Sequence, residues 1–166
     1  MRVLISTALA LCLPALAIAQ STLPQFQPVE MPTHIYGGGW EHFVGGGVAV
    51  FDCNSDEQPE IFAAGGSNPA QLFVNTSHGD VAFTANTPDE LSLTAVTGAY
   101  PLDIDSDGMM DLVVLRVGAD SLLRGIGDCR FEPFDDIAFS SGDHWTTAFS
   151  ATWQERQTLP TLAFGT

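Results

Sequence analysis

Four carboxylates lie close together in one short stretch of the chain, Asp103-Ile104-Asp105-Ser106-Asp107-Gly108-Met109-Met110-Asp111. The acidic side chains occupy the first, third, fifth and ninth positions, and a glycine occupies the sixth. Hard divalent cations need several oxygen ligands at once, and Ca²⁺ accepts the irregular geometry of a short loop. The glycine allows the unusual backbone angles that wrap such a loop around an ion. This stretch is therefore predicted to bind calcium.

The residues after the loop indicate what kind of calcium loop it is. An EF-hand loop has a glutamate at position twelve and lies between two helices. Here position twelve is Val114, inside the apolar run Leu112–Leu115. Such a run of β-branched and apolar residues is typical of a buried strand. The loop is therefore predicted to connect two strands of a hairpin, and it is not an EF-hand.

The same pattern occurs elsewhere in the chain. Oxygen-bearing side chains occupy the same four positions 51 residues earlier, in Asp52, Asn54, Asp56 and Glu60. A degenerate third copy begins at Trp153, 50 residues after Asp103. A repeat of about fifty residues indicates an array of similar supersecondary units, and four short strands in each unit are typical of propeller blades.

The strands of each unit can be predicted from apolar runs separated by glycine, proline and asparagine turns. First strands are expected at residues 47–51, 98–102 and 148–152, and second strands at 61–64, 112–115 and 162–164. Third strands are expected at 72–74 and 122–124, and fourth strands at 81–83 and 130–131. We predict an all-β fold, a partial β-propeller with two full four-stranded antiparallel blades and the start of a third. No helix longer than two turns is expected after residue 45.

The predicted blades span residues 45–94, 95–146 and, in part, 147–166. Residues 20–44 form a separate N-terminal segment, in which Phe26 is expected to lie in an outer strand that closes the propeller. Closure of a propeller takes about 4–8 blades. The chain is therefore expected to be the N-terminal part of a longer protein, or a truncated product.

Residues 1–19 have the pattern of a secretory signal peptide. Arg2 precedes an apolar run over residues 3–16, and Ala17-Ile18-Ala19 provides a cleavage site. Cleavage is predicted after Ala19, and no later stretch is long enough to span a membrane. The mature chain is expected to be secreted or periplasmic. Two cysteines, Cys53 and Cys129, then remain in an oxidising compartment, where both a disulfide and two free thiols are compatible with the sequence.

The charge of the chain restricts its partners. The sequence has 20 acidic and only 5 basic side chains, for a net charge of −15. Such a surface repels nucleic acids and anionic membranes and favours cations or basic partners. The hydrophobic fraction of 45% is sufficient for a folded core.

Residues for catalysis are not evident. His34, His42, His78 and His144 lie in separate segments, and no serine or cysteine motif marks a nucleophile. The spacing of histidines and cysteines does not match a zinc site. The three tryptophans could stack on sugars, although core positions are expected for them. The alternative to a binding module is the propeller segment of a secreted hydrolase or lyase.

Two stretches, GVAVFDCNSDEQPEIFAAGG and GAYPLDIDSDGMMDLVVLRVG, resemble FG-GAP/VCBS repeats, the blades of integrin-α-type propellers. The stretches GGWEHFVGGGVAVFDC and FSATWQERQTLPTLAFG more specifically resemble secreted proteins of the cartilage-acidic-protein-like ASPIC/UnbV group. The resemblance covers about Tyr36 to Thr166. The D-x-D-x-D-G-x-x-D loop is specific for the repeat class but not for any activity.

The resemblance implies a seven-bladed complete propeller with calcium held in the loops between strands. The ligands that it implies in the second loop are Asp103, Asp105, Asp107, Asp111 and the carbonyl of Met109. Those that it implies in the first loop are Asp52, Asn54, Asp56, Glu60 and the carbonyl of Gln58, with Glu57 in place of the usual glycine. The expected function is an exported binding module whose calcium is mainly structural, and whose partner is a protein or a glycan.

Overall fold

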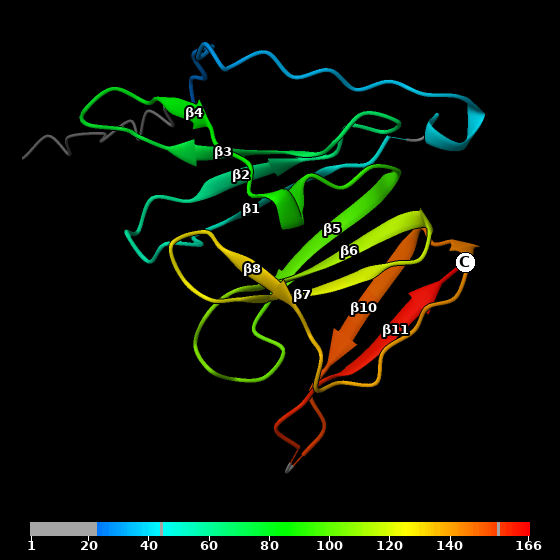
Figure 1. Ribbon diagram of the computed structural model, residues 1–166. Helices are drawn as coiled ribbons and strands as arrows, with labels where there is room; N and C mark the ends of the chain where they lie inside the picture. The colour runs from blue at the N-terminus through cyan, green and yellow to red at the C-terminus, as the bar shows by residue number, and fades with distance from the viewer. Residues whose placement is uncertain (1–22, 44, 156) are drawn as a thin grey trace, which may run out of the picture.

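Short strands with turn residues between them fold into three antiparallel sheets that follow one another along the chain (Figure 1). The computed structural model describes residues 23–43, 45–155 and 157–166. The predicted signal peptide lies outside these residues. Two short 3₁₀ helices, η1 (Trp40–His42) and η2 (Asp89–Leu91), are the only helices of the described part of the chain.

The first two sheets each have four strands in sequential order. The first contains β1 (Val48–Phe51), β2 (Glu60–Ala63), β3 (Gln71–Asn75) and β4 (Phe83–Ala85). The second contains β5 (Val96–Leu102), β6 (Asp111–Gly118), β7 (Ser121–Gly125) and β8 (Phe131–Pro133), and the short β9 (His144–Trp145) pairs with the end of β6. The third is the hairpin of β10 (Ala148–Thr152) and β11 (Thr161–Gly165). The fold is an all-β partial propeller with two complete blades and the first hairpin of a third, which confirms the prediction.

The apolar run in β6 is buried on both faces. Leu112 and Val114 lie in a core shared with the first blade, whereas Val113 and Leu115 lie in a core shared with the third. Alternate residues of a strand point to opposite faces, so one run contributes to two cores. The first blade contributes Ala49, Phe51, Phe62 and Leu72 to the first core. The third hairpin contributes Phe149, Leu162 and Phe164 to the second.

The N-terminal segment runs along the first blade without forming a strand of its own over residues 23–35. The side chain of Phe26 is 93% exposed. The segment contacts this blade (Figure 1), where His34 is bonded through Nε2 to the carbonyl of Ala64 at 2.8 Å and its ring meets the edge of Phe73. These side-chain contacts hold the segment against the first blade. The strand around Phe26 would pair with the last blade of a closed propeller, which is not among the described residues, so it stays a prediction.

Two predictions need correction. The fourth strand of the first blade is Phe83–Ala85 and not residues 81–83, because Thr84 and Ala85 also pair with β3. The tryptophans are not core residues, since Trp40, Trp145 and Trp153 are all exposed. Among the described residues, no helix has the length and apolar character that a membrane crossing requires.

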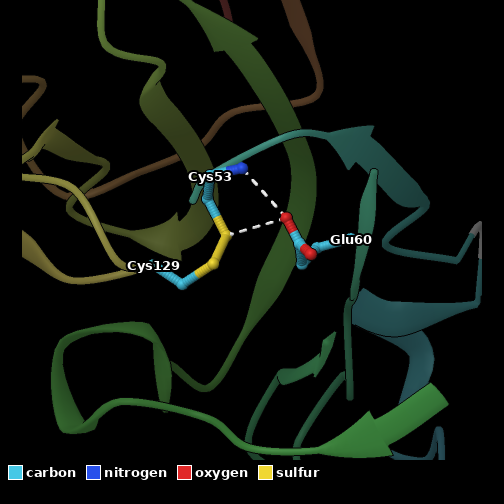
Figure 2. A group of neighbouring side chains, drawn as sticks. All are labelled: Cys53, Glu60 and Cys129. Carbon is cyan, nitrogen blue, oxygen red and sulfur yellow. Dashed lines mark hydrogen bonds between the residues drawn. A yellow bond between two sulfur atoms is a disulfide. The ribbon is translucent and has the colours of Figure 1, made fainter. Parts of the chain in front are cut away.

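A disulfide joins the first blade to the second. Cys53 follows β1 in the first acidic loop, and Cys129 lies in the turn between β7 and β8; the structure links them, with Cα atoms 4.6 Å apart (Figure 2). The backbone N–H of Cys129 also donates to the carbonyl of Cys53 at 3.1 Å. The two cysteines are 76 residues apart in sequence, so the bond closes a long loop of the unfolded chain.

We expect replacement of both cysteines by alanine to lower the free energy of unfolding by about 2–5 kcal/mol, because the unfolded chain gains the conformations that the cross-link forbids. Urea unfolding of the two proteins measures the difference. A reducing agent should destabilise the wild type to a similar extent and leave the Cys53→Ala/Cys129→Ala variant unchanged. Equal stability of wild type and variant would contradict a role for this bond between the blades.

Candidate metal centre

The loop between β5 and β6 brings three of its acidic side chains together. One carboxylate oxygen from each of Asp103, Asp105 and Asp111 lies within 4.8 Å of the other two. Asp103 and Asp105 are half-buried and Asp111 is fully buried. The strand pairing Leu102↔Asp111 fixes the two ends of the loop opposite each other, so the first and ninth positions meet.

The first aspartate of this loop organises its backbone. Asp103 accepts the N–H of Asp107 through Oδ1 at 3.1 Å and that of Gly108 through Oδ2 at 3.0 Å. Gly108 has a φ of 88°, a left-handed conformation that glycine adopts without steric cost. The aspartate and the glycine therefore wrap the loop as the sequence predicts.

The two remaining predicted ligands lie at the exposed tip of the loop. Asp107 is outside the group of three converging carboxylates, but its N–H also approaches Asp105 Oδ1 at 3.3 Å. Asp107 Oδ1 accepts the N–H of Met109 at 2.7 Å. Position seven, whose carbonyl is the predicted ligand, therefore lies beside position five.

Asp111 connects the loop to the third strand of its blade. Its Oδ2 accepts the N–H of Ile104 at 2.7 Å, and its Oδ1 accepts the N–H of Gly125, at the end of β7, at 2.9 Å. A Cβ atom at Gly125 would lie 2.3 Å from the carbonyl oxygen of Met110, so this close approach requires glycine. Burial raises the pKa of Asp111 to about 6, with a smaller contribution from the charges of Asp105 and Asp107, and the two N–H donors oppose the shift.

Sequence analysis missed one charged residue at this centre. Arg124, on β7, donates from Nε to Asp105 Oδ2 at 2.9 Å and forms two hydrogen bonds of 2.8 and 2.9 Å with Asp136. Its guanidinium carbon lies 4.3 Å from the centre of the Phe134 ring. The signal in the sequence was an arginine inside the otherwise apolar third strand Leu122-Leu123-Arg124.

The first loop, between β1 and β2, has the same backbone course. Asp52 Oδ2 accepts the N–H of Glu57 at 2.9 Å, as Asp103 Oδ2 accepts that of Gly108. Glu57 has a φ of 66° in place of the glycine, so its side chain is accommodated at a strained position and the loop geometry is kept. The N–H of Gln58 donates to Asp56 Oδ1 at 2.8 Å.

The predicted oxygen ligands of the first loop do not converge in the same way. Asn54 donates its side-chain amide to Asp56 Oδ2 at 3.1 Å. Glu60 is fully buried and turned toward the disulfide, where Oε2 accepts the N–H of Cys53 at 2.9 Å (Figure 2). Its Oε1 accepts the N–H of Asn75, on β3, at 3.4 Å. Burial raises the pKa of this carboxyl, and the two backbone donors oppose the shift.

The second dashed line in Figure 2 joins Glu60 Oε2 to Cys53 Sγ at 3.2 Å. A disulfide sulfur carries no hydrogen, so this is a close contact. The cluster of Cys53, Glu60 and Cys129 is not a metal site either, although its polar atoms lie close together, because cysteine binds metals as a thiolate and both sulfurs are in the disulfide.

The two loops therefore differ in what they can bind. The second loop combines three converging carboxylate oxygens with no nitrogen or sulfur ligand, a donor set that fits a hard cation such as Ca²⁺. The first loop has one fewer acidic side chain at its ligand positions, because Asn54 replaces Asp105. The third hairpin contacts the second loop through a hydrogen bond in which the Ser106 hydroxyl donates to the carbonyl of Thr158 at 3.0 Å.

Comparison with known proteins agrees with the repeat and the propeller class. A family model described as the FG-GAP-like repeat matches residues 52–114, which begin at the first acidic loop and end in β6. The matched segment therefore contains both acidic loops and the strands between them. Searches of curated proteins and of solved structures gave no match.

The raised pKa of Asp111 makes stability depend on pH when metal is removed with a chelator. The Asp111 carboxyl keeps its proton up to about pH 6 in the folded state but only to about pH 3.8 in the unfolded state. Its protonation therefore stabilises the fold fully below about pH 3.8, and this stabilisation is lost as pH rises through about 6. The Asp111→Asn variant has no carboxyl group at this position and lacks this pH dependence. The stability of the wild type relative to this variant, measured by urea unfolding, should therefore fall as pH rises from about 3.8 through about 6. A difference that does not change with pH would contradict the assignment.

Proposed function

We propose that this chain is part of an exported β-propeller that acts as a binding module, with calcium in the loop 103–111 as a mainly structural ion. The observation that carries the proposal is the convergence of oxygens from Asp103, Asp105 and Asp111 within 4.8 Å. Like charges at this separation repel each other, and a divalent cation between them removes the repulsion. The ion would also cross-link the end of β5 to the start of β6.

Export is supported by two independent features. The first is the charged, apolar and small-residue pattern over residues 1–19. The second is the disulfide between Cys53 and Cys129, a bond that persists in oxidising compartments. The proposed destination is therefore the periplasm or the extracellular medium.

The proposed partner is an extracellular or periplasmic protein or glycan. The net charge of −15 favours a partner with basic groups and disfavours nucleic acid. Membership of the ASPIC/UnbV group is part of this proposal and rests on the sequence resemblance over residues 36–166. Affinity capture from the exported fraction, with calcium and with EDTA, would identify the partner and show whether binding needs the ion.

Calcium should raise the thermal stability of the chain, because it binds the folded loop and hardly binds the unfolded chain. The expected gain is about 2.7 kcal/mol at a hundredfold excess of free calcium over Kd. Asp103→Asn should remove most of this gain. The matched variant in the first loop, Asp52→Asn, should remove less, because that loop has fewer carboxylates at its ligand positions.

The measurement is thermal unfolding of each protein with calcium and with EDTA. Magnesium is the control ion, because it demands near-octahedral geometry and gives up its water reluctantly. Coincident curves in calcium and EDTA would refute the metal site. An equal effect of magnesium at the same low concentration would refute the assignment to calcium.

A further inference from the structure

Arg124 is held on both sides by carboxylates. Its Nε lies 2.9 Å from Asp105 Oδ2, and its terminal nitrogen lies 2.8 Å from Asp136 Oδ1. The side chains of Arg124 and Asp105 are only 22% and 21% exposed, whereas that of Asp136 is 66% exposed. The pair with Asp105 is thus partly shielded from water, and such pairs are screened less than those on an open surface. Arg124 places a fixed positive charge against one of the three converging carboxylates.

The two blades allow an internal comparison at this position. Leu123 pairs with Leu112 in the second blade, and Phe73 pairs with Ile61 in the first. Leu112 and Ile61 each follow the ninth residue of their loop, so the residue after Leu123 is equivalent to the residue after Phe73. Those residues are Arg124 and Val74.

Between the two blades, the charge of the third loop residue changes together with the charge of this strand residue. The third position of the loop is a carboxylate, Asp105, where the strand has Arg124, and it is a neutral amide, Asn54, where the strand has Val74. The additional negative charge of the second loop is therefore accompanied by an additional positive charge. When all carboxylates are ionised, the four acidic ligand positions of the second loop and Arg124 together have a net charge of about −3. The three acidic ligand positions of the first loop, with the neutral Val74, have the same net charge.

We propose that Arg124 is a built-in counter-cation of the loop 103–111, which neutralises Asp105 in the absence of metal and competes with calcium for it. This inference rests on the proposed function, because it concerns the calcium affinity of the same loop. Asp105 Oδ2 accepts the Nε–H of Arg124, so calcium binding through this oxygen must weaken or displace that hydrogen bond. A guanidinium displaced from Asp105 would still be bonded to the carboxylate of Asp136.

Competition and simple positioning predict opposite effects on affinity. If Arg124 competes with the ion, its removal should tighten calcium binding. If Arg124 only orients Asp105 as a ligand, its removal should weaken binding. If it only supports the fold, its removal should lower stability and leave the Kd unchanged.

The principal experiment compares calcium titrations of the wild-type chain and the Arg124→Gln variant by isothermal calorimetry. We expect the Kd of the variant to fall about tenfold, the size of effect that removal of one like charge near a half-buried site gives. In EDTA the same variant should have a lower melting temperature, because Asp105 loses its partner. Arg124→Lys, which keeps the charge, should remain close to the wild type in affinity.

The matched control is Arg130→Gln. Arg130 is exposed and lies just before β8, so this variant makes the same change in net charge away from Asp105. Its calcium Kd should stay within about twofold of the wild type, as expected for an exposed charge that salt screens. A tenfold tightening in this variant too would overturn the proposal, since net charge alone would then explain the effect.

A second variant tests the proposal if Arg124→Gln does not fold. Asp136→Asn removes the charge of the carboxylate that forms two hydrogen bonds with Arg124 and leaves only Glu132, at 4.0 Å, beside Asp105. The guanidinium should then hold Asp105 more firmly, and calcium should bind more weakly. Asp135→Asn is its control, because Asp135 is the exposed neighbour and makes the same change in charge. An unchanged or tighter Kd for Asp136→Asn relative to Asp135→Asn would overturn the proposal.

The outcomes separate this proposal from the proposed function. Calcium binding by the wild type with an unchanged or raised Kd for Arg124→Gln would overturn the role of Arg124 and leave the calcium module standing. Calcium binding by Arg124→Gln alone would support the role of Arg124 and overturn calcium binding by the native chain. Absence of binding to both proteins would overturn both.

Discussion

The buried carboxylate at the ninth position of each acidic loop is the interaction on which this end of the molecule depends. Asp111 accepts one N–H from its own loop and one from the end of β7. Glu60 accepts the equivalent pair from Cys53 and Asn75. Burial of a carboxylate is costly unless its oxygens are satisfied, so the loop and the third strand must meet at this side chain. One residue therefore fixes the hairpin against the rest of its blade, in both blades.

The same residues connect each loop to its neighbours. β6 starts at Asp111, and its next four residues alternate between the cores on either side of the second blade. Cys53 donates its N–H to Glu60 and is bonded to Cys129 of the second blade. The buried carboxylates, the apolar cores and the disulfide thus involve residues that are adjacent in sequence or in direct contact. This end of the propeller is consequently held by three kinds of interaction that act on the same few residues.

The acidic side chains at the ligand positions of the two loops have hydrogen-bond partners in the fold. Most carboxylates of the two loops accept backbone N–H groups of their own loop, so their oxygens have hydrogen-bond partners within the loop. Asp105 has Arg124 as a partner in addition. The proposed calcium ion would reduce the negative charge that these groups leave in the loop 103–111 and would hold that loop in one conformation.

The sequence by itself determined the repeat, the strand order and the wrapping of both acidic loops. These features depend on side-chain alternation and on hydrogen bonds that span only a few residues, as between Asp103 and Gly108. The tertiary structure alone decided that Arg124 meets Asp105, 19 residues away, and that Glu60 turns toward the disulfide. It also left the three tryptophans exposed. Those outcomes depend on which distant segments pack together, and a local pattern of residue types does not encode that choice.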